Sequence, residues 1–508
     1  MSEKEYWIGI DFGNATSCAA VWNGRHAEII EMPDGKKSLP SAVAIVDGKG
    51  LLGQDALDQG RAAMLADGSS LRDYLFRYFK QRMGEVYHEE AESGHQTMAD
   101  PETGLVAWRG PDGYIYQTVE LASYIIEALL KAAEAKLGKR PNCAVITVPA
   151  EASEAQKAAT IAAGKMAGLT RVELMHEPTA AALAYGFDFA KPRRIAVIDH
   201  GAGTIDISII QTGKGRNGHS LVEVKATDGR RRGLGGMDFD RLVAKYLASR
   251  WRTIYPDSEI SNVAFTRIMD QAEAAKIRLS GRDETKVRVP ELATDRNGVS
   301  LTMDEPLDIR IFNEIVVDLR VAIASLCRRA VEKAKEKDPN FSVADINDVV
   351  LVGGMTRCPA VRDAIRSVFG KEPRKDINPE EAVALGAAIE AARLSGRMTG
   401  LTVRDIISQT FAIETLKDVP AIIFPSGTPY PAERTVTIRN ANDGQEALSI
   451  AILEGSQAHA SECTILATYD HPVDPLPAKE NGILLKCRLD EAGRFSAETE
   501  TWKYETAA

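Results

Sequence analysis

Short apolar runs alternate with longer amphipathic segments from Tyr6 to about Arg393. The run CAVITVP at Cys143–Pro149 predicts a buried strand. The segment at Ser153–Gly168 repeats apolar residues at helical spacing, with a serine placed as the N-cap and a glycine just past the end. Alternating strands and helices of this kind predict α/β layers.

One strand-turn motif occurs twice. IGIDFGNATS at Ile8–Ser17 and AVIDHGAGTIDISII at Ala196–Ile210 each carry an apolar run that reaches Asp, skips one residue and continues with Gly. The second motif predicts a β-hairpin, and Asn347–Gly370 predicts a strand, a glycine turn and a helix. This duplication is typical of a two-lobed ATPase, so we expect a nucleotide-binding domain at 1–395 with lobes at roughly 1–194 and 195–395.

The pattern changes near Ser395. Residues 396–410 are polar and punctuated by glycine, which predicts a linker. After Phe411 the helical period disappears, and short runs with period-two alternation follow. These runs predict a small antiparallel β-sandwich at 411–508. No helical pattern follows them, so we expect no C-terminal helical lid.

Composition indicates a globular protein. The chain has 508 residues, of which 44% are apolar and 26% charged, and a net charge of −10. The modest acidic charge argues against a nucleic-acid partner, and GRRRG at Gly229–Gly233 is interpreted as a solvated loop. With no signal peptide, no apolar stretch of membrane-spanning length and widely spaced cysteines, we expect a cytoplasmic protein without membrane contact or disulfides.

The Asp-Gly turns indicate a chemistry. Glycine has no Cβ, so backbone N–H groups can approach a phosphate closely there. A carboxylate beside a phosphate requires a cation between them, and Mg²⁺ is held by one or two carboxylates with phosphate oxygens and water. Asp11 and Asp199 would hold a polyphosphate and Mg²⁺ from two sides. A third glycine turn, at Gly353 and Gly354, adds to this prediction of nucleotide binding.

The sequence resembles the seventy-kilodalton heat-shock chaperones of the DnaK type over nearly the whole chain. The resemblance is carried by IGIDFG, AVITVPA, AGLTRVELMHEPTAAALAYG, IDHGAGTIDISII, LGGMDFD, DVVLVGGMTR and FGKEPRKDINPEEAVALGAA. The stretches HEPTAAALAYG and INPEEAVALGAA separate this family from the sugar kinases and actins that share its fold. The resemblance implies an actin-like α/β ATPase domain, ATP or ADP with Mg²⁺ as cofactors, and extended hydrophobic segments of client proteins as partners.

The resemblance also implies roles for single residues. Asp11 and Asp199 would hold Mg²⁺ through water, and Lys80 would face the γ-phosphate, where a cation stabilises the transferring group. The residues implied in catalysis are Lys80, Glu177, Asp199, Thr204 and Asp206. The residues implied in nucleotide binding are Asp11, Gly13, Asn14, Ala15, Gly201, Ala202, Gly203, Gly235, Gly236, Glu273, Lys276, Ser280, Gly353, Gly354, Met355, Arg357 and Glu380.

These residues have simpler interpretations when taken alone. Lys80 lies in a basic amphipathic stretch and would be a surface lysine. Glu177 stands before a proline and would begin a helix. Glu273 and Lys276 would form a surface pair at i,i+3 spacing, whereas in the family pattern they share one helix face with Ser280 as an adenosine clamp.

The phosphate loops depart from the family pattern. Asn14 and Ala15 replace two threonines of the first loop. In the second loop, Ala202 replaces a glycine and adds a Cβ where backbone would approach phosphate. His200 replaces an apolar residue and is interpreted as a packed or solvent-facing histidine, and Met237 replaces a glutamate beside the nucleotide. We therefore expect ATP binding with slow hydrolysis.

Positions that couple the domains depart as well. Glu173 and His176 replace an arginine and an asparagine that help the family receive a J-domain partner. Glu173 reverses the charge, which argues against a standard J-domain partner. In the linker, Arg404 replaces an apolar residue and should weaken docking onto the ATPase domain, whereas Asp405 is kept.

The β domain resembles the family's peptide-binding sandwich more faintly, through FAIET and ALSIAILEGS. Leu416, Val419 and Leu448 would lie along the peptide groove, and Thr437 replaces a large aromatic residue there. The alternative interpretation is that these are ordinary core positions. A groove without a lid would bind extended peptide by strand addition and release it quickly.

The sequence therefore predicts an atypical, lidless heat-shock chaperone with slow ATPase activity. Two alternatives stay open. One is a regulatory co-chaperone or scaffold that binds ATP and hydrolyses little of it. The other is an actin-fold small-molecule kinase, which is the weaker alternative because no sugar-binding aspartate motif is visible.

Overall fold

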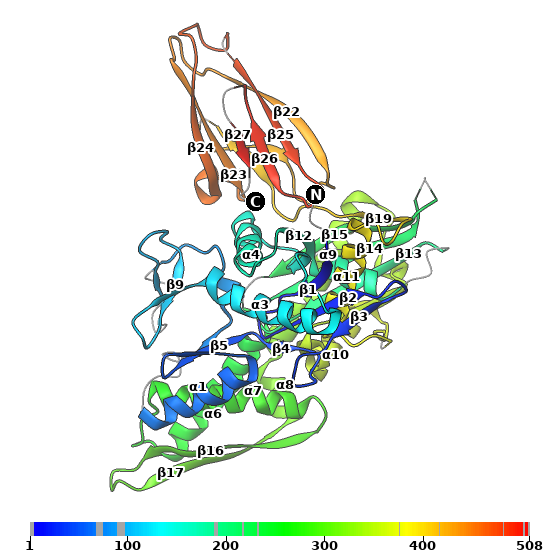
Figure 1. Cartoon of the computed structure of the whole chain (residues 1–508). Helices are drawn as coiled ribbons and strands as arrows, with labels where there is room; N and C mark the ends of the chain where they lie inside the picture. The colour runs from blue at the N-terminus through cyan, green and yellow to red at the C-terminus, as the bar shows by residue number, and fades with distance from the viewer. Residues whose placement is uncertain are drawn as a thin grey trace.

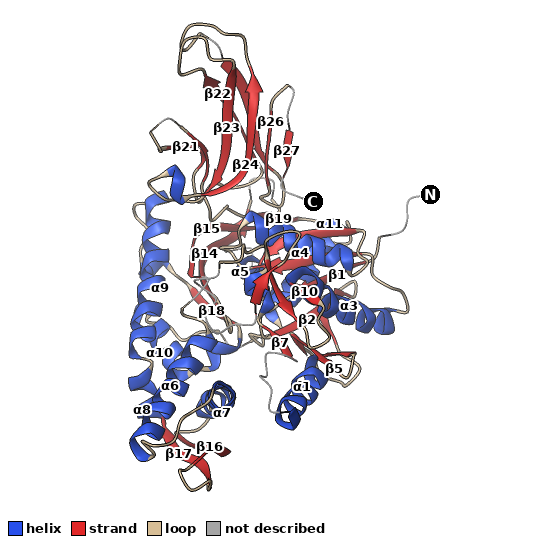
Figure 2. Ribbon diagram, turned by 90° about the vertical axis from the view of Figure 1, so that its left-hand side faces the viewer, coloured by secondary structure: helices blue, strands red, loops and turns tan. Residues whose placement is uncertain are grey.

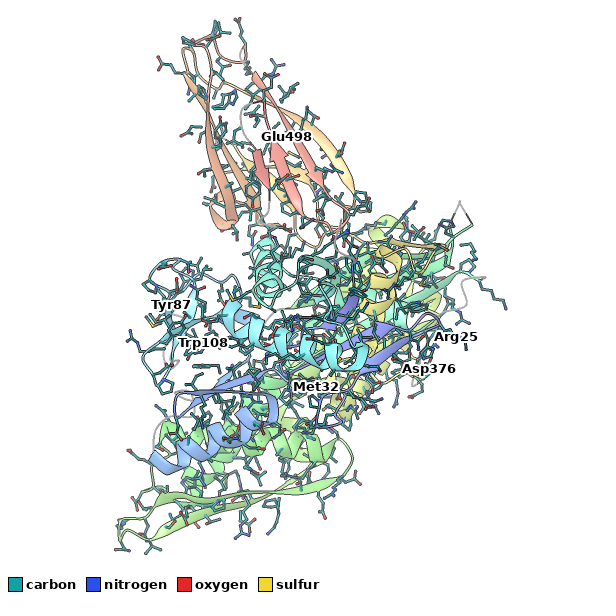
Figure 3. The ribbon with its side chains drawn as sticks, in the orientation of Figure 1. Arg25, Met32, Tyr87, Trp108, Asp376 and Glu498 are labelled. Carbon is teal, nitrogen blue, oxygen red and sulfur yellow. The ribbon has the colours of Figure 1, made fainter. Side chains whose placement is uncertain are left out.

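The computed structural model describes residues 5–67, 75–88, 97–186, 191–215, 218–230, 233–374, 376–415, 417–480, 482–500 and 503–505. These residues form two α/β lobes, with a β-sandwich above them in Figure 1. Figure 3 places Glu498 in the sandwich, with Tyr87 and Trp108 on the opposite side of the lobes from Arg25 and Asp376. Each helix in these ranges is too short or too polar to cross a bilayer.

The first lobe is built on a six-stranded sheet of order β12-β11-β1-β2-β3, with β4 paired to β2. Its strands are β1 (Trp7–Asp11), β2 (Thr16–Trp22), β3 (Ala27–Ile30), β4 (Leu39–Pro40), β11 (Cys143–Val148) and β12 (Arg171–His176). Helices α3 (Thr118–Leu137) and α4 (Glu154–Met166) share a core with β1 and β11. The predicted cap is confirmed, because Ser153 forms a capping box with Gln156 at the start of α4.

The second lobe repeats this arrangement in a five-stranded sheet of order β18-β13-β14-β15-β19. Its strands are β13 (Arg193–His200), β14 (Ile205–Lys214), β15 (Ser220–Arg230), β18 (Asp348–Val352) and β19 (Leu401–Arg404). β13 is parallel to β18 and antiparallel to β14, just as β1 is parallel to β11 and antiparallel to β2. The predicted hairpin is confirmed, and Asp11 and Asp199 stand at matching positions of the two central strands.

Two helices, α5 (Glu177–Ala184) and α11 (Ala382–Leu394), share one apolar core with residues from both sheets. α11 also covers the first sheet, where Ala384 and Ala388 pack against Cys18. The predicted lobe boundary at 194/195 is therefore wrong for this helix. It comes from the second half of the chain but packs on the first lobe, because its small side chains match the small residues of β2.

The other elements lie around these two sheets. The remaining strands of the lobes are β5 (Ala42–Val46), β6 (Lys49–Leu52), β7 (Leu75–Arg77), β8 (Thr97–Ala99), β9 (Val106–Arg109), β10 (Ile115–Gln117), β16 (Glu284–Thr294) and β17 (Ser300–Asp308). The remaining helices are α1 (Gly53–Asp67), α6 (Gly236–Ile254), α7 (Asn262–Leu279), α8 (Ile309–Ile315), α9 (Val317–Lys337) and α10 (Pro359–Phe369), with short 3₁₀ helices η1 (Phe79–Arg82), η3 (Val343–Asp345) and η4 (Gly354–Arg357). Figure 2 shows α9 running up one side of the molecule to the sandwich.

The sandwich consists of two four-stranded sheets of order β21-β20-β23-β24 and β22-β25-β26-β27. Its strands are β20 (Phe411–Glu414), β21 (Pro420–Phe424), β22 (Ala432–Arg439), β23 (Ala447–Glu454), β24 (Thr464–Pro472), β25 (Gly482–Leu489), β26 (Phe495–Glu498) and β27 (Lys503–Glu505), with the 3₁₀ helix η5 (Ala460–Glu462). The rings of Phe411 and Phe495 stack 4.6 Å apart at its centre. One ring comes from each sheet, so the pair holds the two layers together.

The linker contains a strand that the sequence did not predict. Strand β19 pairs in parallel with Ser220–Glu223 of β15 and extends the second sheet. The side chain of Arg404 is exposed, whereas Leu401 and Val403 pack into the apolar core around α5 and α11. Strand β19 therefore docks through its backbone and these two side chains and does not bury the charge.

Asp405 anchors the linker where it leaves β19. Its buried carboxylate lies 3.1 Å from Nδ1 of His176 and accepts a 2.6 Å hydrogen bond from the Thr179 hydroxyl. Burial would raise the pKa of Asp405, but His176 and the hydrogen bonds outweigh burial and lower the pKa below its usual value of 3.8. Asp405 is therefore ionised at neutral pH, and these three residues form a linker latch.

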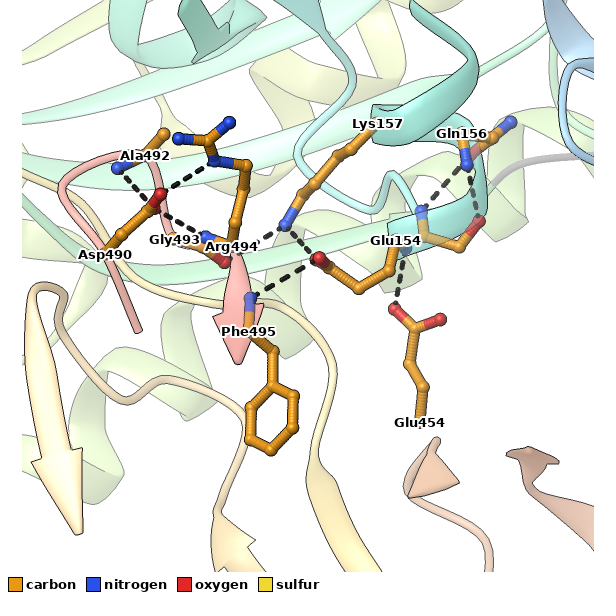
Figure 4. Close-up of polar contacts among 10 residues, drawn as sticks. Glu154, Gln156, Lys157, Glu454, Asp490, Ala492, Gly493, Arg494 and Phe495 are labelled. Carbon is orange, nitrogen blue, oxygen red and sulfur yellow. Dashed lines mark hydrogen bonds and ion pairs between the residues drawn. The ribbon is translucent and has the colours of Figure 1, made fainter. Parts of the chain in front are cut away.

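The sandwich docks on the first lobe at the start of α4, as Figure 4 shows. The backbone N–H of Glu154 donates a 3.1 Å hydrogen bond to Oε1 of Glu454, which places a sandwich carboxylate at a helix N-terminus, where the helix dipole favours it. The buried carboxylate of Glu154 pairs with Lys157 at 2.8 Å and accepts a 3.5 Å hydrogen bond from the N–H of Phe495. These buried polar contacts fix the sandwich against α4.

If the linker latch holds β19 on the second sheet, breaking the latch should expose the backbone amides of β19. Replacing His176 by Ala leaves the buried Asp405 carboxylate without its imidazole partner, and a buried polar group that loses a hydrogen-bond partner costs about 1–3 kcal/mol. We expect hydrogen–deuterium exchange of the amides at 401–404 to rise at least about ten-fold. Arg404→Ala is the matched control and should leave this exchange unchanged, because its side chain is exposed. Equal protection in His176→Ala and the parent chain would contradict the latch.

Candidate functional site

A cavity of about 1450 Å³ lies between the two lobes. It brings together most of the predicted site residues: Asp11, Gly13, Asn14, Ala15, Lys80, Glu177, Asp199, Gly201, Ala202, Gly203, Thr204, Gly236, Glu273, Lys276, Ser280, Gly353, Gly354, Met355, Arg357 and Glu380. Two predicted residues stand behind its wall. Asp206 is buried on β14 opposite Asp199, and Gly235 is the N-cap of α6.

A charge cluster lies in this cavity. Nζ of Lys80, on η1, lies 2.6 Å from Oε1 of Glu177, the first residue of α5. Burial, and next the charge of Glu177, raise the pKa of Asp11 to about 7. Burial and the charges of Glu177 and Asp11 also raise the pKa of Asp199. Lys80 is therefore not the surface lysine of the simpler interpretation, since its side chain is only 12% exposed.

Lys80 stays protonated in this surrounding. Burial would lower its pKa, but the carboxylates of Glu177 and Asp11 outweigh burial and raise it. One ammonium group thus faces three carboxylates, and the excess negative charge is costly away from water. A cation between Asp11 and Asp199 would relieve this cost.

The donor set favours a hydrated cation. Among the described residues, no three His, Cys, Asp or Glu side chains are grouped to hold a metal ion by themselves. Mg²⁺ usually keeps several waters and takes one or two carboxylates together with phosphate oxygens. Asp11 and Asp199 suit this arrangement, and Thr147 orients Asp11 through a 3.3 Å hydrogen bond from its hydroxyl to Oδ1.

The predicted first phosphate loop is held in place by two serines. The N–H of Gly13 donates to Oγ of Ser17 at 3.1 Å, and the hydroxyl of Ser41 donates to the carbonyl of Gly13 at 2.7 Å. A Cβ on Gly13 would overlap the carbonyl oxygen of Thr16. The loop therefore requires glycine here, whereas the roles of the two serines could not be recognised from the sequence.

The predicted second phosphate loop is joined to the start of α6 by backbone hydrogen bonds. The N–H of Met237 donates to the carbonyl of Ala202 at 2.8 Å, and the N–H of Gly236 donates to that of Gly201 at 3.1 Å. These bonds do not depend on the side chains that depart from the family pattern. His200 is fully buried, and burial lowers its pKa to about 4. The interpretation of His200 as a packed histidine is confirmed, because its Nε2 lies 2.6 Å from the carbonyl oxygen of Leu234.

The residues of the predicted adenosine clamp also line the cavity. Glu273 and Lys276 do not pair with each other, so the interpretation as an i,i+3 surface pair is wrong. Buried Lys276 pairs with Asp240 at 2.8 Å, and Glu273 pairs with Arg77 at 3.4 Å. These partners lie far away in the sequence and are brought close by the packing of α6 and α7 in the core of the second lobe.

Further residues of the cavity were missed from the sequence. Gln81 lines it beside Lys80, and Glu454 and Thr464 line it from the sandwich. Its position next to Lys80 was the one feature of the sequence that could have marked Gln81 as a cavity residue. No local pattern marks the two sandwich residues, because their approach depends on domain docking.

The residues that depart at the coupling positions have partners within the chain. Glu173 pairs with Arg171 at 3.0 Å, so its reversed charge is compensated. His176 is buried in the linker latch. Of the predicted groove residues, Val419 is 54% exposed, Leu448 is 2% exposed and Leu416 lies outside the described residues.

The comparison with known families agrees with the two hairpins and the sandwich. The chain matches the family described as Hsp70 protein over residues 7–506, which is nearly its whole length. This family comprises heat-shock 70 type ATP-binding chaperones that bind ATP or ADP, typically with Mg²⁺. The chain belongs to the Hsp70 protein family.

Proposed function

We propose that the cleft binds Mg²⁺-ATP and hydrolyses it slowly, and that the nucleotide controls how the sandwich holds extended apolar segments of client proteins. The charge cluster carries this proposal. The ammonium group of Lys80 can contact a polyphosphate directly, and carboxylates from both lobes can hold the Mg²⁺ that accompanies it. Asp11 and Asp199 would hold Mg²⁺ through water, and the ion would neutralise phosphate charge.

The side chains of the cleft divide the remaining work. Lys80 keeps its proton, so it stabilises negative charge on the transferring group and does not act as a base. Glu177 fixes Lys80 in position through the 2.6 Å contact. Thr204 lies at the cavity wall, where its hydroxyl is available to a phosphate or a water.

The linker latch lies next to the charge cluster in the chain. Glu177 pairs with Lys80, and the preceding residue, His176, pairs with Asp405 of the linker. A shift of Glu177 on nucleotide binding would therefore act on His176 directly. This gives the nucleotide a physical path to the linker, as coupling between two sites requires.

The partner surfaces of this chain differ from the family pattern. At the two positions where the family presents an arginine and an asparagine to a J-domain, this chain has Glu173, which pairs with Arg171, and His176, which the docked linker buries. A J-domain partner would therefore find neither family contact here. In the sandwich, β22 forms one edge of its sheet, and Thr437 on it is exposed. An extended peptide would add to this edge by backbone hydrogen bonds.

Lys80→Ala tests the hydrolysis step. Removing a charge that stabilises the transferring group should lower the single-turnover rate of ATP hydrolysis roughly 100-fold, with a much smaller effect on ATP binding. The control is Lys131→Ala, whose side chain is 69% exposed and pairs with Glu127.

The alternatives give other results in the same assay. ATP binding without Lys80-dependent turnover would support the regulatory co-chaperone. Phosphorylation of an added sugar would support the small-molecule kinase.

Peptide binding tests the coupling. The affinity for a fluorescent, unfolded apolar peptide should differ at least about five-fold between ATP and ADP, the lower end of usual coupling energies. Glu154→Ala removes the buried carboxylate that pairs with Lys157 and accepts from the N–H of Phe495, so it should shrink this difference. Glu102→Ala, at an exposed position, should preserve it. Equal affinity in both nucleotides would refute the coupled chaperone.

A further inference from the structure

Two side-chain amides from the first lobe face the second phosphate loop across the cleft. Asn14 follows Gly13 in the first loop, and Gln81 follows Lys80 on η1; both line the cavity. A Cβ on Gly203 would overlap the amide nitrogens of both side chains. The two amides thus lie against the backbone of Gly203, and the missing Cβ makes room for them.

The amide of Asn14 is buried and has no partner. Both its nitrogen and its oxygen are shielded from solvent, and neither forms a hydrogen bond within the described part of the chain. A buried polar group without a partner costs about 1–3 kcal/mol. An unpaired amide in a cavity wall can be satisfied by a bound ligand. Such a ligand must offer an acceptor to the amide nitrogen and a donor to the amide oxygen.

The neighbouring charges define that ligand. Asp11 and Asp199 can accept hydrogen bonds but repel an anion, so recognition of a phosphate here requires neutral or positive donors. Two amide N–H groups and the Lys80 ammonium supply them. A phosphate oxygen would accept from the amide nitrogen of Asn14, and water on a hydrated cation would donate to its amide oxygen.

We propose that Asn14 and Gln81 form an amide pair that recognises the terminal phosphate of ATP and lets the cleft discriminate ATP from ADP. The inference rests on the proposed function, since it takes the cavity as the nucleotide site. The proposal explains why Asn14 replaces the family's threonine. The amide of asparagine carries a donor and an acceptor, and both lie farther from the backbone than the hydroxyl of threonine.

The experiment measures the dissociation constants of Mg²⁺-ATP and Mg²⁺-ADP by calorimetry on the full chain. In Asn14→Ala and in Gln81→Ala, ATP affinity should fall at least about ten-fold and ADP affinity less than about three-fold, in line with hydrogen bonds to a charged group. Gln54→Ala is the control, because its amide bonds to Asp58 on α1, outside the cavity. It should leave both constants unchanged.

Thermal unfolding separates recognition from a structural role. Asn14→Ala removes an unsatisfied amide, so the Tm of the nucleotide-free chain should stay equal or rise, while the shift produced by ATP becomes smaller. A lower nucleotide-free Tm with an unchanged ATP-to-ADP affinity ratio would show a structural amide and overturn the proposal. If the parent chain binds ATP and both variants keep its ratio, the amide pair alone is refuted; if the parent chain binds neither nucleotide, the proposed function fails with it.

Discussion

The largely buried ammonium group of Lys80 lies among the carboxylates of Glu177, Asp11 and Asp199. The other features of the site follow from this excess of negative charge. Burial, and next the charge of Glu177, hold the pKa values of Asp11 and Asp199 above their usual range. A hydrated cation and a polyphosphate together restore the balance, because the cation neutralises the acids and the phosphate brings oxygens for Lys80 and the loop N–H groups.

The duplicated fold places one aspartate of the cluster in each lobe, at equivalent positions of the two central strands. Each lobe has a central strand that runs parallel to one neighbour and antiparallel to the next, and each places an Asp and a glycine turn near its end. α5 and α11 pack between the sheets and bring the two ends together. Because α5 begins with Glu177, directly after His176 of the linker latch, the core that builds the site also reaches the linker, where it includes Leu401.

Local patterns in the sequence were enough for much of this architecture. Ser153 marks the start of α4, the apolar runs mark the central strands, and the Asp-Gly turns mark the two faces of the cleft. Contacts between distant segments could not be predicted. α11 was assigned to the wrong lobe, Lys276 was not matched with Asp240, and the strand in the linker was missed, because β19 pairs with a strand that lies far away in the sequence.

The central claim is that a cation joins the polyphosphate to the carboxylates of both lobes. Its most direct test is the affinity of the full chain for ATP, measured by calorimetry with Mg²⁺ and again in EDTA. The account predicts one site per chain and binding at least about ten-fold weaker without the cation, because uncompensated charges at close range repel strongly where water is excluded. Equal affinity in the two conditions would contradict it.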